Sequence, residues 1–250
     1  MSEEGKSVVA KTIADQTYRH MRRDIISGAL APGSKLAMEM LSKRYDVGLS
    51  PLREALVRLT GDALAVAEGQ RGFWVSQISL SDLQDMNDAR LLIEGQALAL
   101  AIERGGEEWE QAVTKSHEEL TVLERQLDRV GNANIALWES SNRRFHEALV
   151  SACSSTWLLR LRNVLQQHAE RYCMIALSKS MIARDVHDEH EAIFDAVLAR
   201  KTLRACRLTE MHLQHMAEIV RAALERPAEA VVANRPRHAT AGRGKSSSRR

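Results

Sequence analysis

Arg53 is the side chain of this sequence with the clearest capacity for specific chemistry. The segment Gly48-Leu-Ser-Pro-Leu-Arg53 predicts a helix that begins at Pro51, with Ser50 as its N-cap. A guanidinium near the start of a helix can donate two parallel hydrogen bonds to a guanine in the major groove of DNA. The Ser50 hydroxyl and the first amides of the helix are placed to hold a phosphate. The residues expected to face the bases are Leu49, Ser50, Leu52 and Arg53.

Basic side chains around this segment can neutralise phosphates without reading sequence. They are Lys43, Arg44, Arg58 and Arg71. The alternative for Arg53 is an ion pair with Glu54 on a solvent-exposed helix face. These residues taken alone leave both readings open.

The elements that would position Arg53 follow from the hydrophobic pattern. Helical spacing predicts helices over residues 12–27, 39–45 and 51–60, and the period changes to about two between residues 63 and 78. Two short strands, joined through the glycine-containing turn Glu68–Gly72, complete the pattern. Three helices and a β-hairpin predict a winged helix-turn-helix over residues 11–78, after a flexible N-terminus at residues 1–10.

The rest of the chain is predicted to be helical. Ser81 to Gln84 has the pattern of a capping box and opens a helix that runs to about Arg104, before Gly105 and Gly106. Further helices are expected over residues 107–130, 134–152, 157–179, 184–200 and 202–225. The fold class is therefore mainly α, with an all-α antiparallel bundle over residues 79–225. Residues 226–250, rich in Ala, Arg, Ser and Gly, are expected to form a disordered basic tail.

Composition and charge agree with two globular domains. The chain has 250 residues, of which 44% are hydrophobic and 27% charged. Residues 11–78 carry 10 Lys and Arg against 7 Asp and Glu, residues 79–225 carry 17 against 23, and residues 226–250 carry 7 against 1. A basic first domain suits contact with phosphates, and an acidic middle suits another role.

The sequence argues against a membrane protein and against a metal site built from cysteine thiolates. No apolar run approaches the roughly 20 residues that span a bilayer, and the first ten residues lack the apolar core of a signal peptide. A cytoplasmic protein is expected. Cys153, Cys173 and Cys206 are scattered and form no CxxC pair, so we expect them to be small core residues.

Two motifs carry a resemblance to a known family. The run Leu41 to Leu59 (LSKRYDVGLSPLREALVRL) and the run Glu68 to Val75 (EGQRGFWV) are similar to the DNA-binding signature of GntR regulators. On that pattern Gly72 marks a wing tip that enters the minor groove. The family usually has Ser-Arg-Thr where this chain has Gly48-Leu-Ser50, and the missing arginine implies a different operator sequence.

The second half resembles the FCD effector domain of the FadR subfamily. The matching segments are Asp88–Glu94, Asn142–Leu149 and His190–Val197, with His212 beyond them. In many members an aspartate and three histidines hold a divalent metal, and the corresponding positions are Asn142, His146, His190 and His212. Zn, Ni or Mn would suit these ligands. Asn142 replaces the usual aspartate, and its neutral amide makes a weaker ligand.

The resemblance also implies a partner and an effector. We expect a homodimer on a double-stranded DNA operator, with a small organic acid as effector. Arg90 is expected to hold the carboxylate of that acid and Glu94 to orient it or a ligand imidazole, with Arg171 and Tyr172 as weaker candidates. Five other histidines are expected at the surface or in helix caps: His117, His168, His187, His215 and His238.

Two other classes compete with a regulator. A metal-dependent hydrolase would use the adjacent His146 and Glu147, but HExxH needs a second histidine four residues after the first, and none is present. No Gly-rich phosphate loop or GxSxG motif is present either. An architectural DNA-binding protein without a ligand would not need the long acidic helical domain. The sequence therefore predicts a regulator rather than an enzyme.

Overall fold

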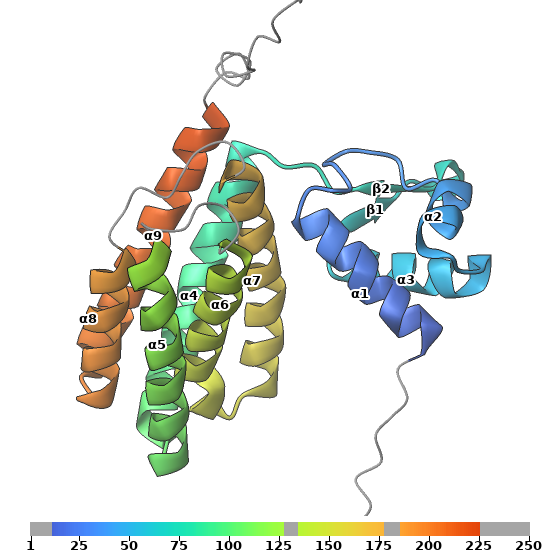
Figure 1. The fold of residues 1–250 in the computed structure, drawn as a ribbon. Helices are drawn as coiled ribbons and strands as arrows, with labels where there is room; N and C mark the ends of the chain where they lie inside the picture. Colours follow the sequence, from blue (N-terminus) through green and yellow to red (C-terminus); the bar gives the residue numbers. More distant parts are fainter. Residues whose placement is uncertain (1–11, 128–134, 178–185, 226–250) are drawn as a thin grey trace, which may run out of the picture.

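The computed structural model describes residues 12–127, 135–177 and 186–225. Figure 1 shows a smaller N-terminal unit beside a larger helical bundle, joined by the segment that follows β2. The predicted N-terminal segment 1–10 and the basic tail 226–250 lie outside the described residues. No helix in the described part of the chain combines the length and the apolar composition needed to cross a bilayer.

The N-terminal unit is a winged helix-turn-helix. Its elements are α1 (Ile13–Ile26), α2 (Met38–Tyr45), α3 (Leu49–Gly61), β1 (Ala65–Ala67) and β2 (Phe73–Val75). The strands are antiparallel, with Ala65 opposite Val75, and a short 3-10 turn (Gly69–Arg71) connects them. Gly69 and Gly72 have φ angles of 48° and 110°, which favour glycine. Three helices and a hairpin confirm the predicted fold of this half.

The helix α3 begins two residues earlier than the sequence predicted. Its N-cap is Gly48, whose carbonyl accepts from the amide of Leu52 at 3.4 Å. Ser50 therefore lies in the first turn, and Pro51 is the third residue of the helix. Proline is tolerated there because the first amides of a helix have no partner within it.

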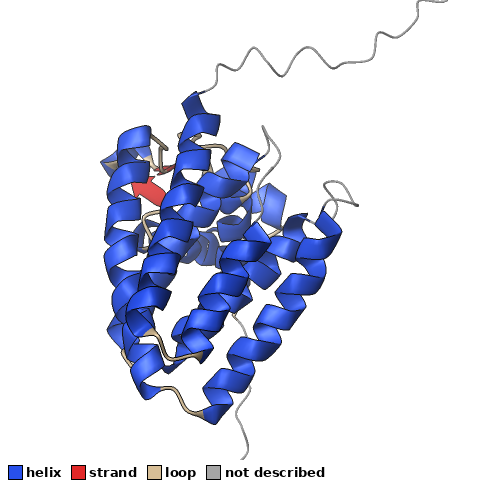
Figure 2. Ribbon diagram, turned by 90° about the vertical axis from the view of Figure 1, so that its left-hand side faces the viewer, coloured by secondary structure: helices blue, strands red, loops and turns tan. Residues whose placement is uncertain are grey.

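The bundle contains six described α-helices that run alternately up and down (Figures 1 and 2). They are α4 (Leu80–Arg104), α5 (Glu107–Leu127), α6 (Ile135–Val150), α7 (Thr156–Leu177), α8 (Val186–Leu198) and α9 (Thr202–Glu225). The N-cap of α4 is Ser79, which accepts from the amide of Asp82 at 3.0 Å, so the predicted cap at Ser81 was wrong. Because α4 packs against α6, α7 and α9, it forms the centre of the bundle.

One helix of the bundle, α7, contacts the N-terminal unit along α1. Arg22 Nε donates to Gln167 Oε1 at 2.9 Å, and His168 Nε2 lies 2.9 Å from the carbonyl oxygen of Asp62. Arg171 donates to the carbonyl of Ser76, in the segment that joins the two parts. Within the described residues, these polar contacts of α7 join the two parts.

Candidate functional site

The first turn of α3 presents exposed side chains. Leu49, Ser50 and Arg53 are all exposed, and Leu49 is 57% exposed. Arg53 forms no hydrogen bond or ion pair with any described residue, so its guanidinium is available to a partner. The alternative pairing with Glu54 is not found among the described contacts.

Leu52 differs from its neighbours, because it is fully buried. It lies on the inner face of α3 with Leu56 and Leu59, at the i, i+4, i+7 spacing of a core stripe. Its predicted contact with DNA bases is therefore wrong, and its role is packing. Its place early in the helix suggested an outward side chain, but the apolar stripe of α3 includes it.

The predicted phosphate contacts divide into two groups. Lys43 and Arg71 are exposed and lie on α2 and in the hairpin turn, beside Gly72. Arg44 is exposed but its guanidinium lies 2.6 Å from Asp24 Oδ2.

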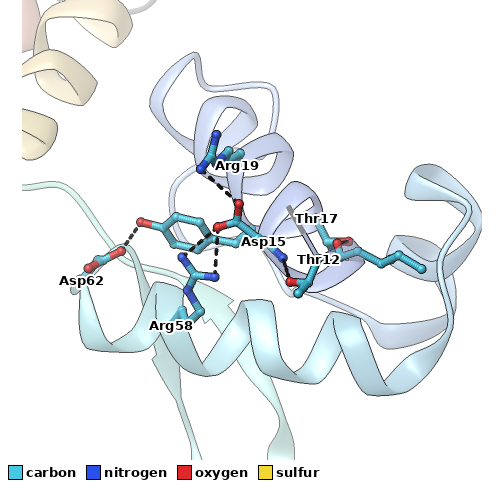
Figure 3. A network of polar contacts seen from close by, with 8 residues as sticks. Thr12, Asp15, Thr17, Arg19, Arg58 and Asp62 are labelled. Atoms are coloured by element: carbon cyan, nitrogen blue, oxygen red, sulfur yellow. Dashed lines mark hydrogen bonds and ion pairs between the residues drawn. The ribbon is translucent and has the colours of Figure 1, made fainter. Parts of the chain in front are cut away.

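Arg58 is held against α1 rather than left free (Figure 3). Both of its terminal nitrogens lie 3.3 Å from Asp15 Oδ1, and its guanidinium lies 4.1 Å from the centre of the Tyr18 ring. The Tyr18 hydroxyl donates to Asp62, and burial together with this bond raises the pKa of Tyr18 to about 12. Arg58 therefore fixes α3 to α1, a role that the sequence did not indicate.

Three histidines meet inside the bundle. His146 on α6, His190 on α8 and His212 on α9 are all buried, and they offer nitrogen atoms that lie within 4.8 Å of one another. Their ring centres are 4.7 to 5.3 Å apart. Such a cluster brings three imidazole rings to one point, as a divalent metal site requires.

The orphaned atoms of this cluster fit a metal ion. His146 Nε2, His190 Nε2 and Asn142 Oδ1 are buried without a hydrogen-bond partner. Burial and the nearby His212, His190 and Arg90 hold the pKa of His146 well below its usual range, so its ring stays neutral. Buried polar atoms without partners are rare in native proteins. Three imidazole nitrogens and an amide oxygen facing one space are a donor set that a borderline divalent cation satisfies.

Carboxylates behind the histidines set their orientation. Glu124 Oε1 lies 2.6 Å from His190 Nδ1, and Glu189 Oε2 lies 2.8 Å from His212 Nδ1. A bond at Nδ1 leaves Nε2 to face a metal. Burial would raise the pKa of Glu124, but the bonds from His190 and His187 lower it overall. The sequence did not reveal these carboxylates, because Glu124 lies 66 residues from His190.

A small cavity adjoins the histidines. Its walls come from α4, α6, α7 and α9, and it encloses about 40 Å³. The polar residues that line it include Arg90, Glu139, Asn142, Gln166, Glu170 and His212. Arg90 donates to Gln166 and its Nε lies 3.6 Å from Glu94 Oε1. The predicted Arg90 and Asn142 therefore line one space with two of the predicted metal ligands, His146 and His212.

Other predicted effector residues lie elsewhere. Glu94 is buried and bonds to Arg162 Nε at 2.7 Å, so it supports the cavity from behind. Arg171 donates to the Ser76 carbonyl, and the Tyr172 hydroxyl lies 2.6 Å from Asp82 Oδ2. Both residues face the segment that joins the two parts, not the cavity.

His117, expected at the surface or in a helix cap, is buried. Its ring stacks on Phe194 with centres 4.1 Å apart, and burial lowers its pKa.

Comparison with known proteins identifies both parts. Residues 13–75 match the bacterial regulatory proteins of the gntR family, and residues 85–215 match the FCD domain. The uncharacterized HTH-type transcriptional regulator BphR of Paraburkholderia xenovorans (strain LB400) is 38% identical over 211 residues, which cover 84% of this chain and 86% of BphR. This chain belongs to the GntR family. It is a DNA-binding transcriptional regulator with an FCD domain, and it is not an enzyme.

Further relatives and structures agree with this assignment. The HTH-type transcriptional repressor GlaR of Escherichia coli (strain K12) is 37% identical to this GntR regulator over 83% of the chain and 95% of GlaR. The solved structure of E. coli McbR/YncC shares its fold with a TM-score of 0.69 at 21% identity, covering 86% of this chain and 99% of that one. A putative GntR regulator from Rhodococcus sp. RHA1 has a TM-score of 0.65 at 20% identity, over 84% and 98% of the two chains.

Proposed function

We propose that this protein is a cytoplasmic repressor that binds its operator as a homodimer and releases it when a small organic acid enters the bundle. Residues 11–78 would form the DNA-binding domain and residues 79–225 the effector domain. Two relatives, GlaR and RspR of E. coli (strain K12), are named as repressors. Each DNA-binding domain would take one half-site, with the first turn of α3 in the major groove and Arg53 against a guanine.

The observation that carries effector release is the double role of α7. Gln166, Ala169, Glu170 and Cys173 line the cavity, at the i, i+3, i+4, i+7 spacing of one helix face. Gln167, His168 and Arg171 lie on another face and contact the N-terminal unit. A ligand that enters the cavity and displaces α7 would therefore change the contacts of this helix with the DNA-binding domain directly.

The size of the cavity makes such a displacement necessary. About 40 Å³ can hold an ion and a few water molecules, but not an organic acid. An acid can enter only if the walls separate, and α7 is one of those walls. Because the acid would bind the opened bundle better than the closed one, it would shift the protein toward the form with altered DNA contacts.

A divalent metal, Zn, Ni or Mn, would be held by His146, His190 and His212 with Asn142. When bound, it would supply open coordination positions for a carboxylate of the effector. Arg90 would hold that carboxylate through parallel hydrogen bonds. The neutral Asn142 leaves the site one negative charge short of an aspartate, which weakens the hold on the cation and favours an anionic ligand.

The test is equilibrium binding of a fluorescent duplex from the upstream region of the protein's own gene. Acids that shift the melting temperature of the protein are first selected from mono- and dicarboxylates, sugar acids and amino acids, with and without a divalent ion. A selected acid should weaken DNA binding by about 5- to 150-fold, the usual range of coupling. An acid that binds the protein and leaves its DNA affinity unchanged would contradict effector release.

A further inference from the structure

One carboxyl group of the cavity has no role in holding an organic acid. Glu139 lies on α6 three residues before Asn142 and seven before His146, on the same helix face, and it lines the cavity with them. It forms no hydrogen bond or ion pair with any described residue. A simple carboxylic acid would add a second negative charge beside it.

The surroundings of Glu139 do not neutralise it. Arg143, its nearest source of positive charge on α6, is bound to Glu170, which lines the same cavity. Burial and the neighbouring Glu170 raise the pKa of Glu139 to about 7, although Arg143 and Arg90 act in the opposite direction. Contact with a hydrogen-bond donor or a cation would stabilise a half-buried carboxyl group in this position.

A basic group lies on a different wall of the same space. Arg90 comes from α4, and its Nε is buried without a hydrogen-bond acceptor. Its contacts with Gln166 and Glu94 leave the guanidinium incompletely satisfied. The cavity therefore presents, from α4, a guanidinium that is ion-paired with Glu94 but whose Nε has no hydrogen-bond acceptor. From α6 it presents a carboxyl group without a donor among the described residues.

We propose that the effector is a zwitterion, a carboxylate that also carries an ammonium group, as amino acids do. Its carboxylate would be directed to Arg90 and its ammonium group to Glu139. Both bonds would be charge-assisted, which makes them stronger than bonds between neutral groups. Glu139 is half-buried and has no partner among the described residues. A site with an unpaired polar group disfavours a ligand that lacks the matching group, so Glu139 would determine specificity. This proposal rests on the proposed effector release and specifies the class of ligand.

The test compares ligands that differ in one group. Isothermal titration of the full-length, nickel-loaded protein uses triplets with a common carbon skeleton: an α-amino acid, the matching α-hydroxy acid and the unsubstituted acid. In the skeleton that binds best, the amino acid should bind at least about tenfold more tightly than the unsubstituted acid. In the Glu139→Gln variant this ratio should fall to within about threefold, because the charge that selects the ammonium group is gone.

The control is Glu147→Gln, an exposed glutamate on the same helix, which should keep the wild-type ratio. Glu139→Gln should not lower the melting temperature of the ligand-free protein, whereas a structurally paired glutamate would. An unchanged ligand ratio in Glu139→Gln, or tighter binding of the unsubstituted acid by the wild type, would overturn the proposal. If unsubstituted acids bind and release DNA, effector release stands and the zwitterion is refuted. If no member of any triplet binds a protein that holds its operator, both proposals fail.

Discussion

The two parts of this regulator are built around opposite kinds of core. In the described residues of the winged helix-turn-helix, Thr17 is the one buried polar side chain, and the core is otherwise apolar, with Met21, Leu41, Leu52 and Leu56 fully buried. The bundle also has an apolar core, but arginines, glutamates and histidines are buried beside it. They include Arg90, Glu94, His146, Arg162, His190 and His212.

This difference corresponds to two tasks: the N-terminal core positions α3, and the interior of the bundle offers polar groups to a ligand. The N-terminal unit interacts with its partner through exposed groups, so its interior needs only to hold α3 rigidly. On the proposed function the bundle binds its ligand inside, and its interior contains polar groups that are costly to bury. Substitutions in the two interiors should therefore affect different quantities: stability in the first part, ligand affinity in the second.

The largest effect on stability is expected from Leu52→Ala. Removing a fully buried leucine side chain leaves a cavity beneath α3 and should lower the free energy of unfolding of the N-terminal unit by about 2–5 kcal/mol. Chemical denaturation followed by circular dichroism measures this loss. Leu49→Ala is the matched control, because its side chain is 57% exposed and its removal should cost little stability. Equal losses of unfolding free energy in both variants would contradict the assignment of Leu52 to the core and of Leu49 to the surface.

Glu124→Gln should change metal affinity rather than stability. Losing the carboxylate behind His190 should weaken nickel or zinc binding by about 10- to 100-fold, because the ring is then less basic and less well oriented. Titration with a competing chelator measures the affinity for the metal. Elemental analysis of His190→Ala, which lacks one ligand, shows the result expected when metal binding is lost completely. Wild-type affinity in Glu124→Gln would show that the carboxylate does not support the ligand. A wild-type protein without metal after growth in replete medium would mean that the cavity works by side chains alone.

The combined variant Gln167→Ala, His168→Ala should reduce communication between the two parts. It removes two contacts of α7 with Arg22 and Asp62 while the cavity-lining face of the helix is unchanged. The effector should still bind, but its effect on the DNA affinity should fall by about five-fold or more, within the usual range of coupling energies. Calorimetry and DNA binding on the same samples separate the two quantities. Undiminished coupling would exclude α7 as the connection.

The N-terminal unit could be predicted from the sequence nearly element by element, because its hydrophobic periods and turns are local. The errors in helix starts were also local. The helices α3 and α4 each begin two residues earlier than expected, since Gly48 and Ser79 rather than Ser50 and Ser81 are the caps. Leu52 was wrongly expected to face the groove, because its environment depends on the inner face of α3. The contact of Arg58 with α1 could not be predicted from local spacing, because its partners lie on another helix.

The bundle interior could be predicted only in part. The convergence of His146, His190 and His212 was expected from the family resemblance, and the structure brings these residues together. Glu124, Glu189 and Arg162 were not found, because their partners lie on other helices and no spacing rule connects them. The helical spacing of Glu139 to Asn142 and His146 is a local signal that places it on their face of α6. Arg171 and Tyr172 were placed in the pocket because the face of α7 that meets the N-terminal unit could not be known.

The most direct measurement is the salt-dependent affinity of the wild type and the Arg53→Ala variant for duplexes from the protein's own upstream region. The wild type should prefer one site, and the preference should weaken with salt as phosphate contacts are lost. Arg53→Ala should lose about 10- to 100-fold in specific affinity per half-site, with the fold intact by circular dichroism. Arg204→Ala, an exposed arginine on α9, should bind as the wild type does. An unchanged footprint in Arg53→Ala, or no preference for any fragment by the wild type, would contradict the account.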